Sequence, residues 1–315
     1  MLKIDLHCHL DGSLSRGCIE ELLGRSVCME ELEVSADCQS LAKYLEKFDL
    51  PLACLQSCAG LERAGYDFME QVSADGLDYV EVRFAPLLST AGGLSCSQVI
   101  EAVLAGMELG KQRFGIPYGV IVCAMRHHTE EENLKMLRAA RGYLGEGVCG
   151  ADLAGNEAVF PMHDFISLFR DVKKLGMPFT IHAGECGSSQ NIEEAILCGA
   201  GRIGHGIAMR GNVRIMELCR SEGIGIEMCP ISNLQTKAVR SKAEYPLREF
   251  LDQGLKVTIN TDNRMVSGTT IEKEIAFVRE EYGISGTEVE LMMKNAVETA
   301  FASDDVKHEL LRKLA

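Results

Sequence analysis

The sequence predicts an α/β protein with a TIM-type (β/α)8 barrel, formed by one domain that spans residues 1–315. Three observations support this fold: β-rich apolar runs alternate with amphipathic stretches, the runs number eight, and no low-complexity linker divides the 315-residue chain. Alternation of strands and helices favours parallel pairing, and eight parallel strands close a barrel. The competing fold is a doubly wound open sheet. That fold usually carries a Gly-rich phosphate-binding turn after its first strand, and this sequence has none.

Each expected strand is a short run of apolar and β-branched residues, and Gly and Pro fall between the elements. The strands are expected at residues 4–10, 79–84, 118–124, 148–153, 178–182, 202–205, 224–229 and 256–262. Apolar residues at helical spacing predict helices between them, at residues 97–114, 130–144, 164–175, 192–198 and 213–221.

The longest connection, residues 11–76, follows the first expected strand and carries several helices. Because βα connections of a barrel lie at the rim where active sites form, this insertion is a candidate active-site lid. Within it, Leu41, Tyr44, Leu45 and Phe48 have the i, i+3, i+4, i+7 spacing of one helix face. The default interpretation of this face is packing on the barrel; the second interpretation, that the face covers a bound ligand, is implied only by the family resemblance carried by the motifs below.

Composition limits the expected partners. The formal net charge of −14 repels polyphosphate, which disfavours nucleic acid and anionic membranes and favours a small neutral molecule. No stretch reaches about 18 uninterrupted apolar residues, and the N-terminus lacks the apolar core of a signal peptide. The 13 cysteines are scattered without a C-x-x-C pair, which indicates small buried side chains in a reducing cytoplasm rather than a disulfide framework.

Four of the eight histidines lie at the ends of expected strands: His7 and His9 on the first, His182 on the fifth and His205 on the sixth. His7 and His9 are two residues apart on a strand, so both side chains project from the same face. Two neutral imidazoles on one face suit a divalent metal. An H-x-H pair alone is weak evidence, since two structural histidines on a strand give the same pattern.

Two carboxylates also lie at the ends of expected strands: Glu185 follows the fifth strand, and Asp262 ends the eighth. All these groups fall at the C-terminal ends of strands, the rim at which barrel enzymes place catalytic residues. A structural pair of His182 and Glu185, or a helix cap at Asp262, would explain single residues but not the shared edge. Three imidazoles and one carboxylate can hold zinc and leave a position for water, whose pKa falls to about 7. A further carboxyl group can act as general acid, so the residues compose a hydrolase centre.

Six motifs occur in order along nearly the whole chain. They are His-Cys-His-Leu-Asp-Gly-Ser at 7–13, Asp-Leu-Ala-Gly-Asn-Glu at 152–157, His-Ala-Gly-Glu at 182–185, Arg-Ile-Gly-His-Gly at 202–206, Cys-Pro-Ile-Ser-Asn at 229–233 and Asn-Thr-Asp-Asn at 260–263. Together they resemble the adenosine deaminase family, which belongs to the amidohydrolase barrels. The set is highly specific, whereas each motif alone is modest.

The resemblance implies a catalytic centre with one zinc ion per chain. The zinc ligands that it implies are His7, His9, His182 and Asp262. Glu185 would give a proton to purine N1, while His205 and Asp262 would position the zinc-activated hydroxide that attacks C6. The expected chemistry is therefore replacement of an amino group by oxygen, with loss of ammonia.

The resemblance also assigns a substrate pocket to His9, Asp11, Gly155 and Asn263. Asp11 matches a contact to the ribose 5′-hydroxyl, and the backbone of Gly155 matches a contact to purine N3. Asn263 stands where many members of the family have a second Asp, directed at purine N7. An amide can donate to N7 without being protonated, whereas a carboxyl group must carry a proton to do so. Apart from the resemblance, Asp11 begins an ordinary turn signal, and a glycine can serve any turn.

The expected activity is the zinc-dependent hydrolytic deamination of adenosine and deoxyadenosine, which yields inosine and ammonia from adenosine. One alternative is a deaminase of another 6-aminopurine, such as adenine or a modified adenosine. A purine-binding barrel without catalysis would be expected to lose a ligand or Glu185, and this chain has all of them. A metal-dependent hydrolase of esters or lactams is a further alternative. The H-x-E and P-C-x-x-C signature of deaminases with Cys ligands is missing from the sequence.

Overall fold

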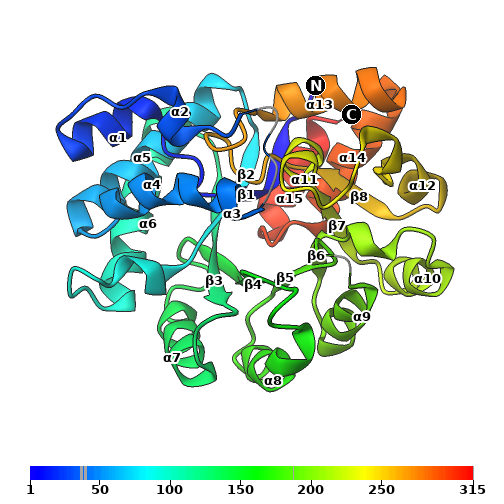
Figure 1. Cartoon of the computed structure of the whole chain (residues 1–315), viewed down its shortest axis with the longest axis horizontal. Helices are drawn as coiled ribbons and strands as arrows, with labels where there is room; N and C mark the ends of the chain where they lie inside the picture. The colour runs from blue at the N-terminus through cyan, green and yellow to red at the C-terminus, as the bar shows by residue number, and fades with distance from the viewer. Residues whose placement is uncertain (36–37, 39–40, 187, 315) are drawn as a thin grey trace.

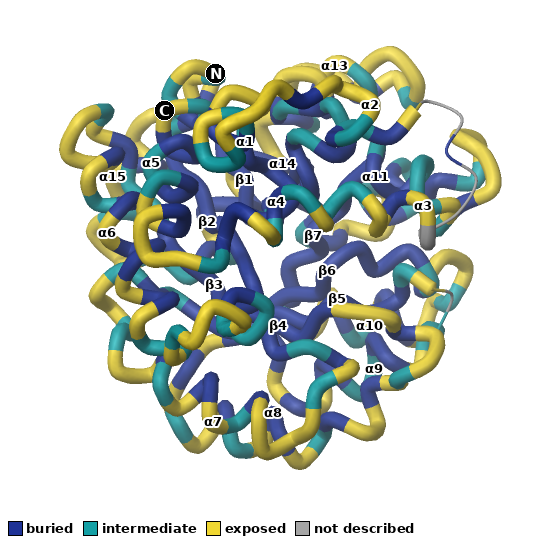
Figure 2. Tube along the Cα trace, turned by 60° about the vertical axis from the view of Figure 1, so that its left-hand side comes forward, coloured by how far each residue is buried: buried dark blue, intermediate teal, exposed yellow. Residues whose placement is uncertain are grey.

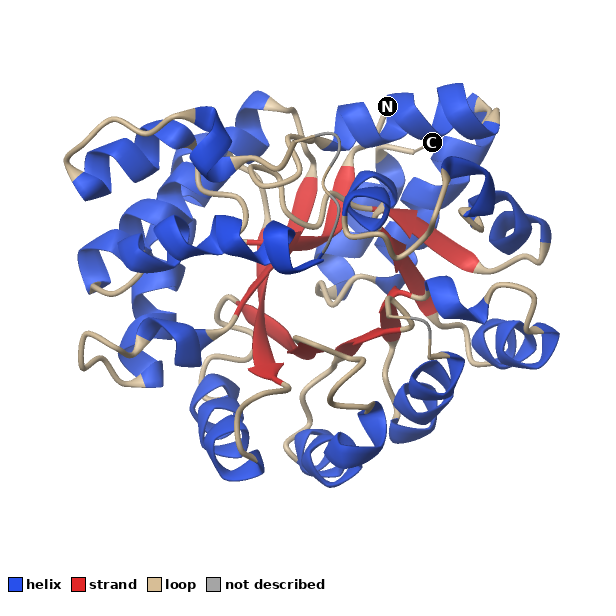
Figure 3. Cartoon of the chain, in the orientation of Figure 1, coloured by secondary structure: helices blue, strands red, loops and turns tan. Residues whose placement is uncertain are grey.

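The computed structural model describes residues 1–35, 38, 41–186 and 188–314, without the side chains of Leu41 and Ala42. Within these residues, eight strands form the centre of the molecule and helices surround them (Figures 1 and 3). This is the TIM-type α/β barrel that the sequence predicts. The strands are β1 (Ile4–His9), β2 (Tyr79–Phe84), β3 (Tyr118–Met125), β4 (Val148–Ala154), β5 (Thr180–Ala183), β6 (Arg202–His205), β7 (Gly225–Met228) and β8 (Lys256–Ile259).

All neighbouring strands are parallel, in the orders β1-β2-β3-β4 and β5-β6-β7-β8. Two short junctions join these halves into a closed barrel. The amide of Ala151 in β4 donates to Pro178 O at 2.9 Å, just before β5. At the other junction, the amide of His9 donates to Asp262 O at 2.6 Å, and the amide of Asp262 donates to His7 O at 2.8 Å. The second junction therefore lies among the predicted metal ligands.

The helices after β2 cover the outside of the barrel. They are α6 (Cys96–Phe114), α7 (Glu130–Arg141), α8 (Ile166–Lys174), α9 (Ser189–Cys198), α10 (Val213–Ser221), α11 (Pro230–Gln235), α12 (Leu247–Asp252), α13 (Ile271–Tyr282), α14 (Gly286–Thr299) and α15 (Asp304–Arg312). Ser95, Thr129 and Ser285 start α6, α7 and α14 with capping boxes, in which the cap side chain and a Glu or Gln satisfy amide groups at the helix start.

The connection between β1 and β2 is helical, as its sequence predicts. Its helices are α1 (Arg16–Leu23), α2 (Met29–Leu32), α3 (Leu41–Leu45), α4 (Asp49–Cys54) and α5 (Cys58–Ala74). The connection also contains a single turn of 3-10 helix, η1 (Glu46–Phe48). The other single turns of 3-10 helix lie later in the chain: η2 (Pro86–Ser89), η3 (Met162–Phe165), η4 (Ile207–Met209) and η5 (Lys242–Glu244). In Figure 1 this connection occupies the upper left of the molecule, beside the barrel mouth.

Two expected strand boundaries differ from the structure for backbone reasons. The eighth strand ends at Ile259 rather than at Asp262, because Asp262 has a φ of 59°, a left-handed conformation that cannot continue the pleat. The fifth strand begins at Thr180 rather than at Pro178, which has no N–H group to pair. Asp262 thus leaves the strand on a turn of its own, which places its side chain beside β1.

The strands are buried and the outer helix faces are exposed (Figure 2). Eight of the 13 cysteines are buried, which agrees with the prediction that most cysteines serve as small apolar side chains, whereas Cys28, Cys58 and Cys186 are exposed. Among the described residues, no helix combines the length and the apolar composition that crossing a membrane requires.

Candidate active site

A cavity of about 420 Å³ lies at the C-terminal ends of the strands. Its lining combines residues from strand ends with residues from the β1–β2 connection. The predicted site residues in this lining are His9, Asp11, Tyr44, Leu45, Phe48, Gly155, His182, Glu185, His205, Asp262 and Asn263. His7 lies behind the lining and is fully buried.

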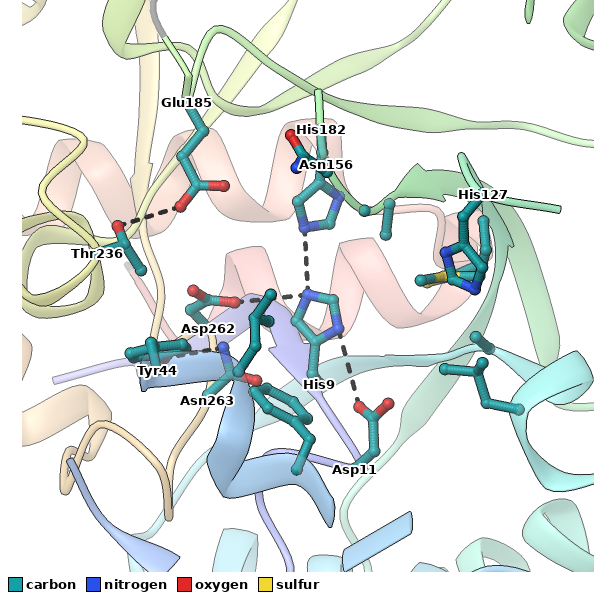
Figure 4. Close-up of a pocket in the computed structure, with 18 of the residues that line it drawn as sticks. His9, Asp11, Tyr44, His127, Asn156, His182, Glu185, Thr236, Asp262 and Asn263 are labelled. Carbon is teal, nitrogen blue, oxygen red and sulfur yellow. Dashed lines mark hydrogen bonds and ion pairs between the residues drawn. The ribbon is translucent and has the colours of Figure 1, made fainter. Parts of the chain in front are cut away.

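The four predicted metal ligands are close to one another. His7, His9, His182 and Asp262 each offer one ligand atom, and these atoms lie within 4.8 Å of one another. Nε2 of His9 is 3.2 Å from Nε2 of His182 and 3.4 Å from Oδ1 of Asp262 (Figure 4). Nε2 of His7 is 3.5 Å from the same carboxylate oxygen. Tetrahedral ligands at about 2.0–2.1 Å from zinc stand roughly 3.3–3.4 Å apart, so the spacing fits a metal ion.

Two carboxylates outside the cavity set the tautomers of His7 and His182. Nδ1 of His7 donates to Oε2 of Glu227 at 2.7 Å, and Nδ1 of His182 lies 2.8 Å from Oδ2 of Asp152. An ionised carboxylate only accepts hydrogen bonds, so each Nδ1 carries the proton and each Nε2 keeps a lone pair for a metal. Nε2 of His7 is buried without a hydrogen-bond partner, which further indicates that a ligand belongs there.

The remaining two ligands are also in the correct charge state. Burial, opposed in part by the charge of Asp262, holds the pKa of His9 well below its ordinary value, so the ring is neutral near pH 7. Burial alone would raise the pKa of Asp262, but its hydrogen-bonded and polar surroundings favour the ionised form and hold the pKa below its ordinary value. The hydroxyl of Ser232 donates to Oδ2 of Asp262 at 2.5 Å, which leaves Oδ1 turned toward the histidines.

Glu185 lies across the cavity from the ligand group (Figure 4). Its Oε1 accepts a hydrogen bond from the hydroxyl of Thr236 at 3.3 Å, and its Oε2 is 3.7 Å from Nε2 of His205. The loop that carries it is fixed by the carboxylate of Glu157, which accepts from the amides of Gly184 at 2.6 Å and Glu185 at 3.0 Å. Glu185 is therefore held at the cavity wall with one oxygen directed at His205.

His205 has a φ of 65°, and a left-handed conformation is unusual outside glycine. Its Nδ1 accepts from the side-chain amide of Asn233 at 2.9 Å, and the hydroxyl of Tyr245 holds the other end of that amide at 3.4 Å. With Nδ1 occupied as an acceptor, the proton of a neutral ring lies on Nε2, beside Glu185. Strained backbone at a site of this kind commonly marks a functional position.

Three further predicted residues surround the same cavity. Asp11 is nearly buried, and this burial raises its pKa to about 6. Gly155 has a φ of 107°, which L side chains rarely adopt. The side-chain amide of Asn263 donates to the hydroxyl of Tyr44 at 3.0 Å, which turns its NH₂ group toward the cavity wall formed by α3. These positions agree with a pocket that binds a substrate beside the ligand group.

The predicted helix face in the β1–β2 connection is only partly described. Tyr44, Leu45 and Phe48 line the cavity, whereas the side chain of Leu41 lies outside the described residues. The hydroxyl of Tyr44 is 2.7 Å from the hydroxyl of Ser267 as well as bonded to Asn263, so the face is tied to the loop after β8.

Several residues that build the site were given no role from the sequence. Four of them stand in the quoted motifs at 152–157 and 229–233, namely Asp152, Glu157, Ser232 and Asn233, whereas Arg83, Glu227 and Thr236 stand in none. For Arg83, Asp152 and Glu227 a signal exists, because a charged residue inside an otherwise apolar strand requires a buried partner. The sequence does not identify the buried partner of each charged residue, so the contacts of these three residues with one another and with the histidines are known only from the fold.

A closed parallel barrel with three imidazoles and a carboxylate at its C-terminal mouth is the architecture of a metal-dependent amidohydrolase. The family model for adenosine deaminase matches residues 3–315. An adenosine deaminase from Enterococcus faecalis is 40% identical, over 99% of this chain and 95% of its own length. The chain belongs to the adenosine deaminase family.

Solved structures share the same fold. An N6-mAMP deaminase from Arabidopsis has a TM-score of 0.89 and 25% identity, over 100% of this chain and 97% of that one. A zinc-bound amidohydrolase from Burkholderia ambifaria has a TM-score of 0.90 and 20% identity, over 100% of this chain and 89% of that one. The barrel predicted from the sequence is therefore confirmed by comparison as well as by its own topology.

Proposed function

We propose that this protein deaminates adenosine and deoxyadenosine by hydrolysis, with one Zn²⁺ per chain. The observation that carries the proposal is that three of the four metal-ligand residues line one cavity with Glu185 and His205, and that the fourth, His7, lies directly behind them. Membership of the adenosine deaminase family, with relatives of that name at 38–40% identity, supports adenosine as the substrate.

His7, His9, His182 and Asp262 would hold the divalent metal, which would supply hydroxide as the nucleophile near neutral pH. Asp262 and Nε2 of His205 hold the attacking oxygen toward C6 of the purine. Glu185, which lies beside His205 at the cavity wall, gives a proton to N1 as C6 is attacked. The proton of the hydroxyl group now on C6 then passes to the amino group, the C6–N bond breaks as the C6=O bond forms, and ammonia leaves.

The substrate lies between the ligand group and the β1–β2 connection in this proposal. Asp11 accepts a hydrogen bond from the ribose 5′-hydroxyl, while the Gly155 backbone and Asn263 contact N3 and N7 of the purine. His9 contributes to substrate binding as well as to the metal. The alternative substrates are other 6-aminopurines, adenine or a modified adenosine, which would use the same catalytic groups.

The charge of the cavity favours a nucleoside over a nucleotide. Among the described residues that line it there is no Lys or Arg, whereas Asp11 and Asp49 are both present. A phosphate near these acids would meet no cation to balance its charge, and like charges repel. The N6-mAMP deaminase of similar fold acts on a nucleotide by its name, whereas the acidic cavity of this chain disfavours a phosphate group.

Zinc-loaded protein should convert adenosine and deoxyadenosine with ammonia release, and AMP far more slowly. Asp11→Ala should lower kcat/KM for adenosine by about 10–100-fold, the usual weight of a hydrogen bond to a charged group. A matched control is 5′-deoxyadenosine, which lacks the hydroxyl and should lose nothing further in the variant. Ultraviolet absorbance and ammonia assays measure each rate. The proposal would be contradicted if the zinc-loaded protein deaminated none of the 6-aminopurines tested, or if it hydrolysed esters or lactams instead.

We also propose that the β1–β2 connection, residues 11–76, acts as an active-site lid. Its face Leu41, Tyr44, Leu45 and Phe48 would cover the nucleoside, and three of these residues line the cavity. The Tyr44 hydroxyl would hold the lid closed through Asn263 and Ser267.

Tyr44→Phe should raise KM for adenosine by roughly 2–10-fold, since it removes neutral hydrogen bonds and keeps the ring. Tyr66→Phe is the control, because Tyr66 lies on α5 outside the cavity lining. Steady-state kinetics on both variants provide the test, and an unchanged KM in Tyr44→Phe would count against the latch.

We further propose that residues 1–315 form one domain, which agrees with a family match over 3–315. The proposed activity would place the protein in purine metabolism. The scattered cysteines support a place in the cytoplasm, and the net charge of −14 supports a small-molecule partner rather than nucleic acid.

A further inference from the structure

Arg83 is the penultimate residue of β2, and its side chain is fully buried. Its Nη1 donates to Oδ2 of Asp152 at 2.8 Å, and its Nη2 donates to Oε2 of Glu227 at 2.9 Å. Nη2 also donates to the carbonyl of Leu6, one residue before His7, at 2.7 Å. One guanidinium thus connects three strands of the barrel below the cavity.

The two carboxylate oxygens that Arg83 contacts are the same atoms that meet the histidines. Oε2 of Glu227 accepts from Nδ1 of His7 at 2.7 Å. Oδ2 of Asp152 lies 2.8 Å from Nδ1 of His182. The planar fork of the guanidinium therefore fixes the separation of two oxygens, and each of them fixes the direction of one imidazole.

We propose that Arg83 is a positioning residue of the metal centre, which sets the geometry of His7 and His182 through Glu227 and Asp152. The inference rests on the proposed function in one respect only, that a divalent metal occupies the ligand group. It adds a residue that touches neither metal nor substrate and yet controls metal affinity.

The charges of the cluster are consistent with this role. Beneath the ligand group, two buried guanidinium groups and three buried carboxylates form one ion-pair network. These residues are Arg83, Arg202, Glu81, Asp152 and Glu227. Without Arg83 the carboxylates would be buried with less compensation, which is strongly unfavourable in a low-dielectric interior.

The charge of Arg83 and its geometry have opposite effects on metal affinity. A positive charge below the site repels a cation, so its mere removal would strengthen metal binding by Coulomb's law. Arg83→Lys keeps the charge and removes the fork, because an ammonium group cannot hold both oxygens at their fixed separation. This substitution therefore tests the geometry alone.

Arg202 offers a matched control on β6. It is fully buried and also contacts Glu227, but through Oε1 at 2.5 Å, and its other partners are Glu81 at 2.6 Å and the carbonyl of Thr299 at 2.9 Å. It reaches neither Asp152 nor the oxygen that meets His7. Arg202→Lys thus imposes the same change on a buried strand arginine without releasing both histidines.

The experiment measures zinc affinity of the intact protein by competition with a chromophoric chelator, and the visible spectrum of the cobalt-substituted form. Arg83→Lys should weaken zinc binding by about 10–100-fold, as loss of such supporting contacts commonly does, and should shift the cobalt bands. Arg202→Lys should change affinity by less than about 3-fold and leave the bands in place. Thermal unfolding of the metal-free variants shows whether their folds are equally stable.

Wild-type affinity in Arg83→Lys, or equal losses in both variants, would overturn the assignment. If Arg83→Lys does not fold, the double variant Arg83→Gln/Asp152→Asn removes one charge of each sign, and wild-type affinity there would overturn it as well. Wild-type protein that binds zinc but leaves adenosine unchanged would refute the proposed substrate and not this inference. Wild-type protein that binds no divalent metal would refute both.

Discussion

Glu185→Gln should reduce kcat for adenosine by about 10²–10⁴-fold while the zinc content stays at one per chain. The amide has the shape of the carboxyl group but no proton of suitable acidity for N1, and loss of a general acid commonly has an effect of this size. Glu185 is not one of the four ligand residues, so metal binding should be unaffected. Stopped-flow or steady-state rates, together with metal analysis of the same sample, provide the two measurements.

Thr236→Val is a graded control for this variant. It removes only the hydroxyl that donates to Oε1 of Glu185 at 3.3 Å, and one neutral hydrogen bond corresponds to a roughly 2–10-fold change in rate. A small loss in Thr236→Val beside a large loss in Glu185→Gln would separate proton transfer from positioning. Full activity of Glu185→Gln would remove the proposed role, whatever the control shows.

The fold, and the gathering of four histidines and two carboxylates at one rim, could be predicted because their signals are local in the chain. The choice of His7, His9, His182 and Asp262 as the metal ligands came from the family resemblance. Each strand is a short apolar run, and His7, His9, His182 and His205 stand at or near the ends of such runs. The barrel brings strand ends together by topology, so no knowledge of long-range contacts was needed to gather them.

What could not be predicted depends on contacts between distant segments or on a single backbone angle. Arg83, Asp152 and Glu227 lie on three separate strands, and only the fold shows that they share atoms with the histidines. The end of β8 was placed too late because nothing in the residues of Ile-Asn-Thr-Asp announces the positive φ of Asp262. The hydroxyl of Tyr44 likewise accepts a hydrogen bond from Asn263, which is 219 residues away in the sequence.

Removal of the metal should abolish activity and lower thermal stability together. The Nε2 of His7 is buried without a partner, and the buried carboxylate of Asp262 lies against the imidazoles of His7 and His9, so binding of a divalent cation there should favour the folded state. At a free zinc concentration 1,000 times Kd, linkage gives about 4 kcal/mol of stabilisation. For a chain of 315 residues, with an unfolding entropy of about 2.1 cal/mol/K per residue, that corresponds to a rise in Tm of roughly 6 °C. A chelator should therefore abolish activity and lower Tm, and added zinc should restore both.

His182→Ala should eliminate this response to zinc, since it removes one of the four ligand atoms and leaves the negative charges in place. His127→Ala is the matched histidine control: His127 lines the same cavity, but it is exposed and stands apart from the ligand group (Figure 4). The two variants therefore differ in ligand geometry and not in residue type. Scanning fluorimetry with and without zinc should show a large shift for wild type and His127→Ala, and almost none for His182→Ala. If His182→Ala gained as much stability from zinc as wild type, the ion would have to bind elsewhere, and the catalytic role assigned to this cavity would lose its basis.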